Sequence, residues 1–254
     1  IGAMFGLVST LLSAWTGDGS GYQVAKTQPM KLAAMEGYYE GREGAGLVAV
    51  GLLNPDKEKY NDGKDPFIFR VEIPQMLSLL AKRELNAFVP GVKDIIEGGY
   101  VQKDGTVALS AAEKIERGKK AIAALASYRS AKKEGNTATA DSAYVTLQEN
   151  MAYFGYGYIK DVHHLVPNVP ITFYAFRIMV MLGFYFILFF AVVLFLVYKD
   201  KLAEMKWMHW IALLTIPLGY IAAEAGWVVA ECGRQPWAIQ DLLPTAASVS
   251  RVRG

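Results

Sequence analysis

The chain has 254 residues, of which 53% are hydrophobic and 20% are charged, and its net charge at pH 7 is +2. A net charge so close to zero gives a nucleic-acid partner no electrostatic support. The single cysteine, Cys232, excludes both an intramolecular disulfide and a CxxCH haem-attachment motif. This composition, with a mean hydropathy of +0.21, is typical of membrane spans that alternate with a sizeable water-exposed region.

Residues 1–15 are apolar apart from small and hydroxyl side chains. A helix of this length reaches only about 22 Å, which is less than the roughly 30 Å hydrocarbon core of a membrane. We therefore expect the end of a transmembrane helix whose beginning is missing, so that the chain is a fragment. Residues 16–22 (TGDGSGY) predict a turn-rich exit from the membrane.

Residues 26–36 (KTQPMKLAAME) predict a short helix that begins at Pro29, because proline is favoured at the first helical position. This helix carries one basic and one acidic side chain, Lys31 and Glu36. The residues alone leave two interpretations open, a pair of ordinary charges on a solvated helix and a functional pair.

The region 37–170 is polar, and it is too long for a plain connector. It predicts a small extramembrane domain or an extended functional loop, with a strand at 67–73 and helices at 74–85, 110–133 and 141–159. His163 and His164 lie near its end. Adjacent histidines in a polar stretch bounded by prolines are more typical of a surface than of a haem site.

Residues 178–197 contain no charge and are long enough to cross a membrane as one helix. Arg177 and Met179 stand at its entry. A methionine in this place ordinarily packs or contacts lipid, although a thioether is also an axial ligand of haem iron.

The connector 198–206 carries three lysines, which the positive-inside rule places in the cytoplasm. A second span is expected at 207–230, with a bend near Pro217. This topology places the long polar region and the end of the chain on the same outer face of the membrane. His209 then lies at the cytoplasmic end, where we expect it to be structural.

Two acidic residues in or near the second span, Glu224 and Glu231, are seven positions apart and so share nearly the same helix face, with Trp227 close to it. A carboxylate at such a depth is costly, and it therefore has a partner or a function as a rule. One interpretation is an interfacial ion pair of Glu231 with Arg234, with Trp237 in the aromatic belt. The other is a functional site.

The stretch GWVVAECGRQPW resembles the GW-x-x-x-E-x-GRQPW signature of subunit I of cytochrome bd quinol oxidase. The segments GDGSGY, KLAAME and FRIM are similar to further motifs of that family, in the same order. The resemblance covers all 254 residues and implies an α fold, a membrane helix bundle with a long, mainly helical extramembrane quinol-binding loop. The implied segments are a helix end at 1–15, the loop at 16–170, spans at 171–198 and 207–232, a cytoplasmic connector at 199–206 and the GRQPW end at 233–254.

The resemblance implies a quinol:oxygen oxidoreductase. The chain would be part of the catalytic subunit, which oxidises membrane quinol, reduces oxygen to water and generates a proton gradient. The implied cofactors are a low-spin haem b, a high-spin haem b and haem d, and the implied partners are subunit II, a small single-helix subunit, the first half of subunit I and membrane lipid. The implied location is the bacterial cytoplasmic membrane, crossed more than once, with the long loop on the periplasmic side.

The family's functional residues are carried over motif by motif. Lys31 and Glu36 match residues implicated in quinol oxidation. Met179 matches the methionine ligand of the low-spin haem b iron. Arg177, two residues away, is implied to bind a haem propionate or to help set the haem potential through its charge. Glu231 matches a ligand to the iron of one of the two high-spin haems.

The remaining matches surround that glutamate. Trp227 lies a turn before it and is implied to sit between haems. Arg234 and Gln235 are implied to hold propionates or to orient the carboxylate.

The chain departs from the family in one respect. The family's histidine ligands lie in the first half of the subunit, and none of the three histidines here occupies such a place. Two other classes stay open, a membrane-anchored quinone-binding or assembly module without its own redox centre, and a transporter with an intramembrane glutamate. Haem absorbance that depends on Met179 and Glu231 would distinguish the oxidase from both.

Overall fold

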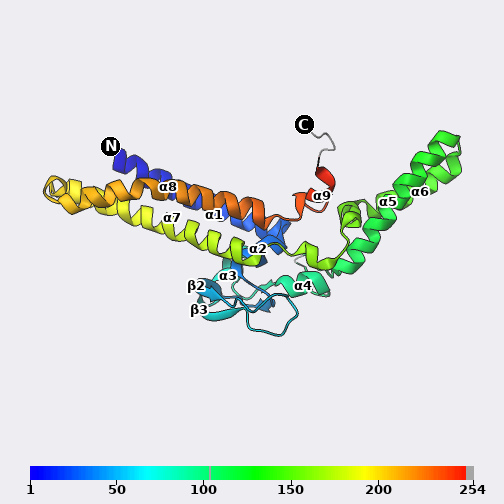
Figure 1. Cartoon of the computed structure of the whole chain (residues 1–254), viewed down its shortest axis with the longest axis horizontal. Helices are drawn as coiled ribbons and strands as arrows, with labels where there is room; N and C mark the ends of the chain where they lie inside the picture. Colours follow the sequence, from blue (N-terminus) through cyan, green and yellow to red (C-terminus); the bar gives the residue numbers. More distant parts are fainter. Residues whose placement is uncertain (103, 250–254) are drawn as a thin grey trace.

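The computed structural model describes residues 1–102 and 104–249. Three long helices lie side by side, and the rest of the chain lies below one half of them and beyond that end (Figure 1). They are α1 (Gly2–Thr27), α7 (Val169–Tyr198) and α8 (Lys206–Gly233). A short connection with the 3-10 turn η3 (Leu202–Glu204) joins α7 to α8, so the two helices run in opposite directions.

Within the described residues, two helical segments are long and apolar enough to cross a membrane, Val162–Tyr198 and Lys206–Gly233. Their most apolar windows have mean hydropathies of 2.9 and 1.5, yet only 6% and 11% of those windows are buried. Apolar side chains that face outward along a whole helix suit lipid better than a soluble core. Pro217 lies inside α8 and does not end it.

Helix α1 corrects the prediction of a turn at 16–22, because the helix continues through this stretch to Thr27. No proline interrupts it, and the hydroxyls of Thr16 and Ser20 each donate to the carbonyl oxygen four residues earlier. An ion pair between Asp18 and Arg83 of the loop region holds the same stretch. Each of the helical glycines in this stretch is nevertheless roughly 1 kcal/mol less favourable than alanine.

The first half of the loop region forms a small antiparallel unit below the long helices (Figure 1). Its elements are α2 (Pro29–Glu36), β1 (Arg42–Glu43), β2 (Leu47–Leu53), β3 (Phe67–Ile73), α3 (Met76–Lys82) and β4 (Phe88–Val89). β2 pairs with β3, from Leu47 opposite Ile73 to Leu53 opposite Phe67, and β1 pairs with β4. The predictions of a helix that begins at Pro29 and of a strand at 67–73 are confirmed, whereas α3 is shorter than the predicted helix at 74–85 and β2 was not predicted.

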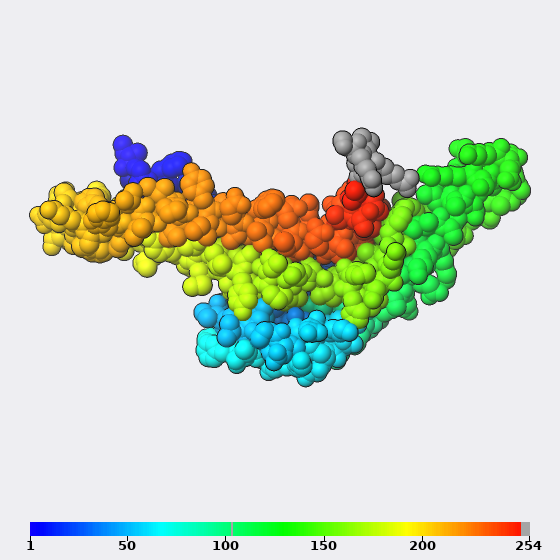
Figure 2. All heavy atoms as spheres, viewed as in Figure 1, coloured from blue at the N-terminus to red at the C-terminus, as the bar shows by residue number. Residues whose placement is uncertain are grey.

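The second half of the loop region is helical, and its α5–α6 hairpin extends away from the rest of the molecule (Figure 2). Its elements are α4 (Val92–Glu97), α5 (Ala111–Glu134), α6 (Thr137–Asn150), η1 (Met151–Tyr158) and η2 (Val162–Leu165). The predicted helix at 110–133 is confirmed, and a reciprocal capping box between Ser110 and Glu113 fixes its start. The predicted helix at 141–159 is wrong in its bounds, because α6 ends at Asn150 and a 3-10 helix follows.

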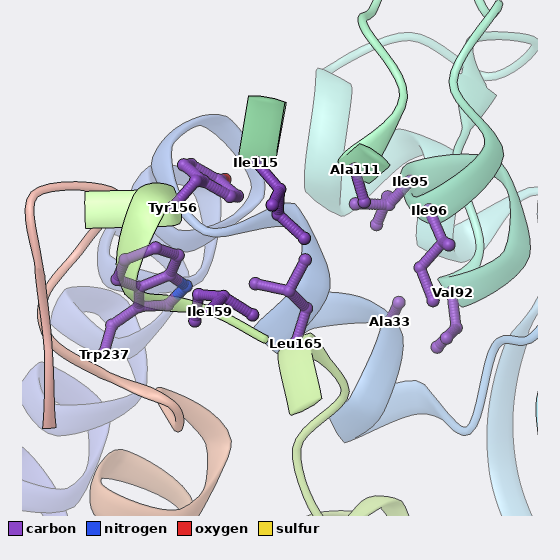
Figure 3. Close-up of a cluster of buried hydrophobic side chains, with 10 residues drawn as sticks. All are labelled: Ala33, Val92, Ile95, Ile96, Ala111, Ile115, Tyr156, Ile159, Leu165 and Trp237. Carbon is purple, nitrogen blue, oxygen red and sulfur yellow. The ribbon is translucent and has the colours of Figure 1, made fainter. Parts of the chain in front are cut away.

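A buried apolar cluster joins the loop region to the segment after α8 (Figure 3). That segment consists of β5 (Trp237–Ile239), β6 (Leu243–Pro244) and α9 (Thr245–Ser248). In the cluster, Trp237 packs edge-on against Tyr156 of η1, with the ring centroids 4.8 Å apart. The GRQPW end of the chain is therefore anchored on the loop region. The fold is mainly helical, with two candidate spans and a long helical loop, as predicted.

Candidate functional site

Helix α2 lies where the loop region meets the ends of α7 and α8, and it contacts both of them. Its small residues Ala33 and Ala34 are 2% and 0% exposed, so the helix backbone approaches its neighbours closely. Lys31 and Glu36 are five positions apart, which on a helix places them about 140° from one another. The two charges therefore point to different neighbours.

Glu36 points to α7 and is 2% exposed. Its carboxylate accepts a hydrogen bond from Nη2 of Arg177 at 2.6 Å, and Nη1 of the same guanidinium donates to the carbonyl oxygen of Met35 at 3.4 Å. Burial raises the pKa of Glu36, and the positive charge of Arg177 opposes that rise. Glu36 is thus no solvated surface charge. The Arg177 guanidinium, which the family resemblance directs to a haem propionate, has this carboxylate as its partner here.

Apart from Glu36 and the Met35 carbonyl oxygen, the Arg177 guanidinium lies against aromatic rings. Its guanidinium carbon lies 4.6 Å from the ring centroid of Phe173 and 5.2 Å from that of Phe176, both on α7. Its Nε is buried without a hydrogen-bond partner among the described residues. The pair therefore sits in an apolar, water-poor surrounding, where a charge is strongly dependent on its counter-charge.

Lys31 points to α8, where its aliphatic stem lies on Gly233. A methyl group at Gly233 would stand 3.1 Å from Cγ and 3.3 Å from Cε of the lysine, so it would require the lysine stem to shift. Burial lowers the pKa of Lys31, the positive charge of Arg234 lowers it further, and the negative charge of Glu231 opposes both. Lys31, Glu231 and Arg234 therefore form one group of neighbouring charges.

Glu231 and Arg234 form an ion pair, with Nη2 of the arginine 2.7 Å from Oε2 of the glutamate. Both side chains are partly exposed. Gln235 donates from Nε2 to the carbonyl oxygen of Glu231 at 3.3 Å and accepts from the hydroxyl of Thr245 at 3.0 Å. These contacts hold the end of α8 and the following turn in one arrangement around the Glu231 carboxylate.

Met179 lies on α7, two residues beyond Arg177, and its sulfur faces α8 at Gly226. A methyl group at Gly226 would stand 3.1 Å from that sulfur. The glycine therefore makes room for the thioether, as Gly233 does for Lys31. Trp227, next to this glycine, is 63% exposed.

Two side chains near this end of the bundle, Met179 and Glu231, carry donor atoms of a kind that could ligate a haem iron. A thioether is an axial ligand of haem iron, and a carboxylate is an oxygen ligand for iron. Among the described residues no three His, Cys, Asp or Glu side chains are grouped so that they could hold a metal ion. Met179 and Glu231 would accordingly contribute one ligand each.

The three histidines lie apart from this group. His163, His164 and His209 are all exposed, and the ring of His163 packs against that of Tyr60 at 5.3 Å. The expectation that His163 and His164 are surface residues is confirmed. The contacts that sequence reasoning missed are the pairing of Glu36 with Arg177 and the places that Gly226 and Gly233 leave for Met179 and Lys31. The only sequence signal for these contacts was the pair of glycines in the GW-x-x-x-E-x-GRQPW signature, because a glycine allows a neighbouring side chain to approach the helix closely.

The fold and this arrangement define a helical membrane protein in which charges of a folded loop meet the ends of two spanning helices. The model of the family "Cytochrome bd terminal oxidase subunit I" matches residues 1–254, and the chain belongs to that family.

Relatives and a solved structure agree with this assignment. The chain is 32% identical over 252 residues to the cytochrome bd-II ubiquinol oxidase subunit 1 of Escherichia coli, covering 98% of this chain and 47% of the relative. It is 27% identical over 246 residues to the cytochrome bd ubiquinol oxidase subunit 1 of Bacillus subtilis, covering 96% of this chain and 39% of the relative. The structure of bd oxidase from Geobacillus thermodenitrificans matches with a TM-score of 0.58 and 25% identity, over 96% of this chain and 40% of that one. The chain thus spans less than half the length of these relatives.

Proposed function

We propose that the chain forms part of the catalytic subunit of a cytochrome bd-type terminal oxidase, a quinol:oxygen oxidoreductase that generates a proton gradient. The observation that carries this proposal is the position of α2. Through Glu36 it contacts α7, which carries Met179, and through Lys31 it contacts α8, which carries Glu231. The two residues proposed for quinol oxidation thus lie against both helices proposed to hold haem.

On the substrate side, a quinol that gives up two electrons also releases two protons. Glu36 can accept one of them, because burial raises the pKa of its carboxyl and makes it a better base than an exposed glutamate. Lys31 donates hydrogen bonds and orients a ring oxygen. The Arg177 guanidinium holds the Glu36 carboxylate in place until the proton arrives.

On the haem side, a low-spin haem b, a high-spin haem b and haem d would, when bound, carry the electrons onward and reduce oxygen to water. Met179 would hold the iron of the low-spin haem b, and Glu231 that of a high-spin haem. Arg234 would steady the Glu231 carboxylate or a propionate. Gln235 would fix the end of α8, which carries Glu231 and is followed by Arg234. We place the exposed ring of Trp227 between haems.

The partners in this proposal are subunit II, a small single-helix subunit, the remaining part of subunit I and membrane lipid. We place the protein in the bacterial cytoplasmic membrane, with the loop region on the periplasmic face. Protons from quinol would leave on that face, and protons for water formation would come from the cytoplasm. The lysines of the α7–α8 connector support this orientation.

The test is a reduced-minus-oxidised absorbance spectrum of membranes that contain this chain with its natural partners. We expect Met179→Leu to change the low-spin haem b bands and Glu231→Gln to change those of a high-spin haem. Met181→Leu is the matched control, because Met181 is exposed on the same helix as Met179. Spectra that Met179→Leu and Glu231→Gln leave unchanged would refute the ligand assignment. A flat spectrum of the unsubstituted protein would support a quinone-binding module without a redox centre.

A further inference from the structure

The antiparallel ribbon of β2 and β3 carries apolar side chains on a face that the described residues leave open. Val50 pairs with Val71 and Leu52 pairs with Phe69, and the side chains of directly opposed residues lie on the same face of a sheet. All four side chains are between 48% and 58% exposed. They form one apolar patch, which we call the outer face of the ribbon.

The other face of the ribbon packs against α7. Its buried residues form one cluster with a phenylalanine of that helix: Val48, Leu53, Phe67 and Phe173. A methyl group added at Gly51 would stand 3.0 Å from the side chains of Phe67 and Val48, so this position faces the cluster. Since successive residues of a strand alternate between faces, its neighbours Val50 and Leu52 face away from the cluster. The outer face is therefore directed away from the contact with α7.

A hydrogen bond fixes the height of the ribbon along α7. The backbone N–H of Leu53 donates to the hydroxyl of Tyr174 at 3.0 Å. Tyr174 lies four residues, about 6 Å, before Ile178, where the charge-free run 178–197 begins. The headgroup layer on each side of the roughly 30 Å hydrocarbon core is about 5–8 Å thick. When the run 178–197 fills that core, Tyr174 and the ribbon bound to it lie at the level of the headgroups, where tyrosine is enriched in membrane proteins.

The ribbon is attached to a side of α7 that is apolar and open. Ile178 and Met181 follow Tyr174 by four and seven residues, so they lie on nearly the same helix face. They are 45% and 60% exposed, so α1 and α8 do not cover them. The open apolar surface of the span therefore continues, at the beginning of α7, into the ribbon. This continuity at headgroup depth favours lipid over a soluble partner as the occupant of the outer face.

The charges on the ribbon also suit a phospholipid surface. Glu72 is the only acidic residue in the two strands, and its carboxylate binds both Arg42 at 2.5 Å and Arg70 at 3.1 Å. One positive charge of this group is therefore not compensated. A positive charge at the height of the lipid phosphates is favourable.

We propose that the outer face of the β2–β3 ribbon lies on the lipid bilayer, among the headgroups and upper acyl chains of phospholipids. An exposed apolar patch of this kind marks an interaction surface, and its depth on α7 makes lipid the partner. The contact would hold the first half of the loop region against the membrane beside α7. This inference rests on the membrane location of α7 in the proposed function, and it is independent of quinol oxidation and of haem.

The first experiment measures depth with nitroxide spin labels on the complete complex in nanodiscs of phosphatidylethanolamine and phosphatidylglycerol. Cys232 is the only cysteine of this chain, so the complex with Cys232→Ser gives the background signal. One cysteine is then introduced by Phe69→Cys on the ribbon, by Met181→Cys on the span, or by Val145→Cys on α6, where the native valine is 54% exposed.

The readout is the ratio of label collisions with oxygen to collisions with a nickel–EDDA complex. Oxygen concentrates in the bilayer and the nickel complex stays in water, so we expect the ratio at position 69 to be at least about threefold above that at position 145 and below that at position 181.

The second experiment uses the unsubstituted complex and a phospholipid with a photoactivatable diazirine beside its headgroup. Peptides that contain β2 or β3 should carry the label. In the double variant Leu52→Glu with Phe69→Glu, labelling should fall about fivefold, because carboxylates leave the apolar layer and are repelled by anionic headgroups. Val145→Glu, at an exposed valine of α6, should leave the labelling unchanged.

The outcomes separate this inference from the proposed function. A collision ratio at position 69 equal to that at position 145, with position 181 still in the bilayer, would overturn the inference and leave the location of α7 standing. A position 69 that neither reagent reaches, without lipid label on β2 or β3, would also overturn it, since protein would then cover the ribbon. A ratio at position 181 as low as that at position 145 would overturn the membrane location of α7 and the inference together.

Discussion

The buried pair of Glu36 and Arg177 gives the sharpest test of the packing between α2 and α7. Replacing Arg177 by methionine keeps much of the side-chain volume and removes the charge. The Glu36 carboxylate, 2% exposed, is then left without its counter-ion, 2.6 Å away in the native protein. Breaking a buried ion pair by removing one partner costs about 3–5 kcal/mol of the free energy of unfolding. The unpaired Nε of Arg177 in the native protein puts the expected value at the lower end of that range.

The loss of unfolding free energy in Arg177→Met should depend on pH, and the direction of that dependence follows from the pKa of Glu36. Burial raises the pKa of this carboxyl above its ordinary value of 4.5, so the stability that it contributes is fully present below that value and is lost as pH rises through the folded pKa. Removing the guanidinium takes away the charge that opposes the rise. The loss of stability therefore continues to higher pH in Arg177→Met. The difference in unfolding free energy between the unsubstituted protein and the variant should be larger near pH 8 than near pH 5.

The assay is urea unfolding of the detergent-solubilised complex, followed by far-ultraviolet circular dichroism at about pH 5 and about pH 8. The double variant with Glu36→Gln should recover much of the loss and show little pH dependence, since no buried charge remains. Arg129→Met, at an exposed arginine of α5, is the control. A penalty below about 1 kcal/mol that is equal at both pH values would show that Glu36 is not an unpaired buried charge in the variant, and the reasoning would fail.

Two further predictions concern the glycines of α8. Gly226→Ala would bring a methyl to 3.1 Å from the Met179 sulfur, so we expect a shifted reduction potential of the low-spin haem, whereas Gly219→Ala, with open space around it, should shift nothing. Gly233→Ala would crowd the stem of Lys31 at 3.1 Å, so we expect KM for quinol to rise at unchanged haem absorbance. An unaltered potential in the first variant, or an unaltered KM in the second, would contradict the contacts described for these glycines.

Local signals allowed parts of the fold to be predicted from the sequence. The uninterrupted apolar run of α7 and the amphipathic pattern of α5, with its Ser110 cap, lie in single continuous segments, and their prediction needed no tertiary information. β2 gave no such signal, because Gly51 interrupts it and its burial alternates irregularly around a bulge. The glycines of 16–22 favoured a turn, yet α1 continues through them, and the ion pair of Asp18 with Arg83 is a contact that no local pattern reports.

The candidate site was also only partly predictable from the sequence. The motifs identified the candidate side chains, but not which of them are in contact. Arg177 and Glu36 are 141 positions apart, and no local pattern reports a contact at such a separation.

The spacing of Lys31 and Glu36 on the eight-residue helix α2 limits how this helix can contact its neighbours. Its two charged side chains are fixed on a single rigid turn and a half, each against a different long helix. Inserting one residue between Lys31 and Glu36 would rotate one of them by about 100° relative to the other. No tilt of α2 could then restore the contact with Arg177 and the contact with Gly233 together. The spacing within the KLAAME segment therefore fixes the angle between the two side chains, so that Glu36 meets α7 while Lys31 meets α8.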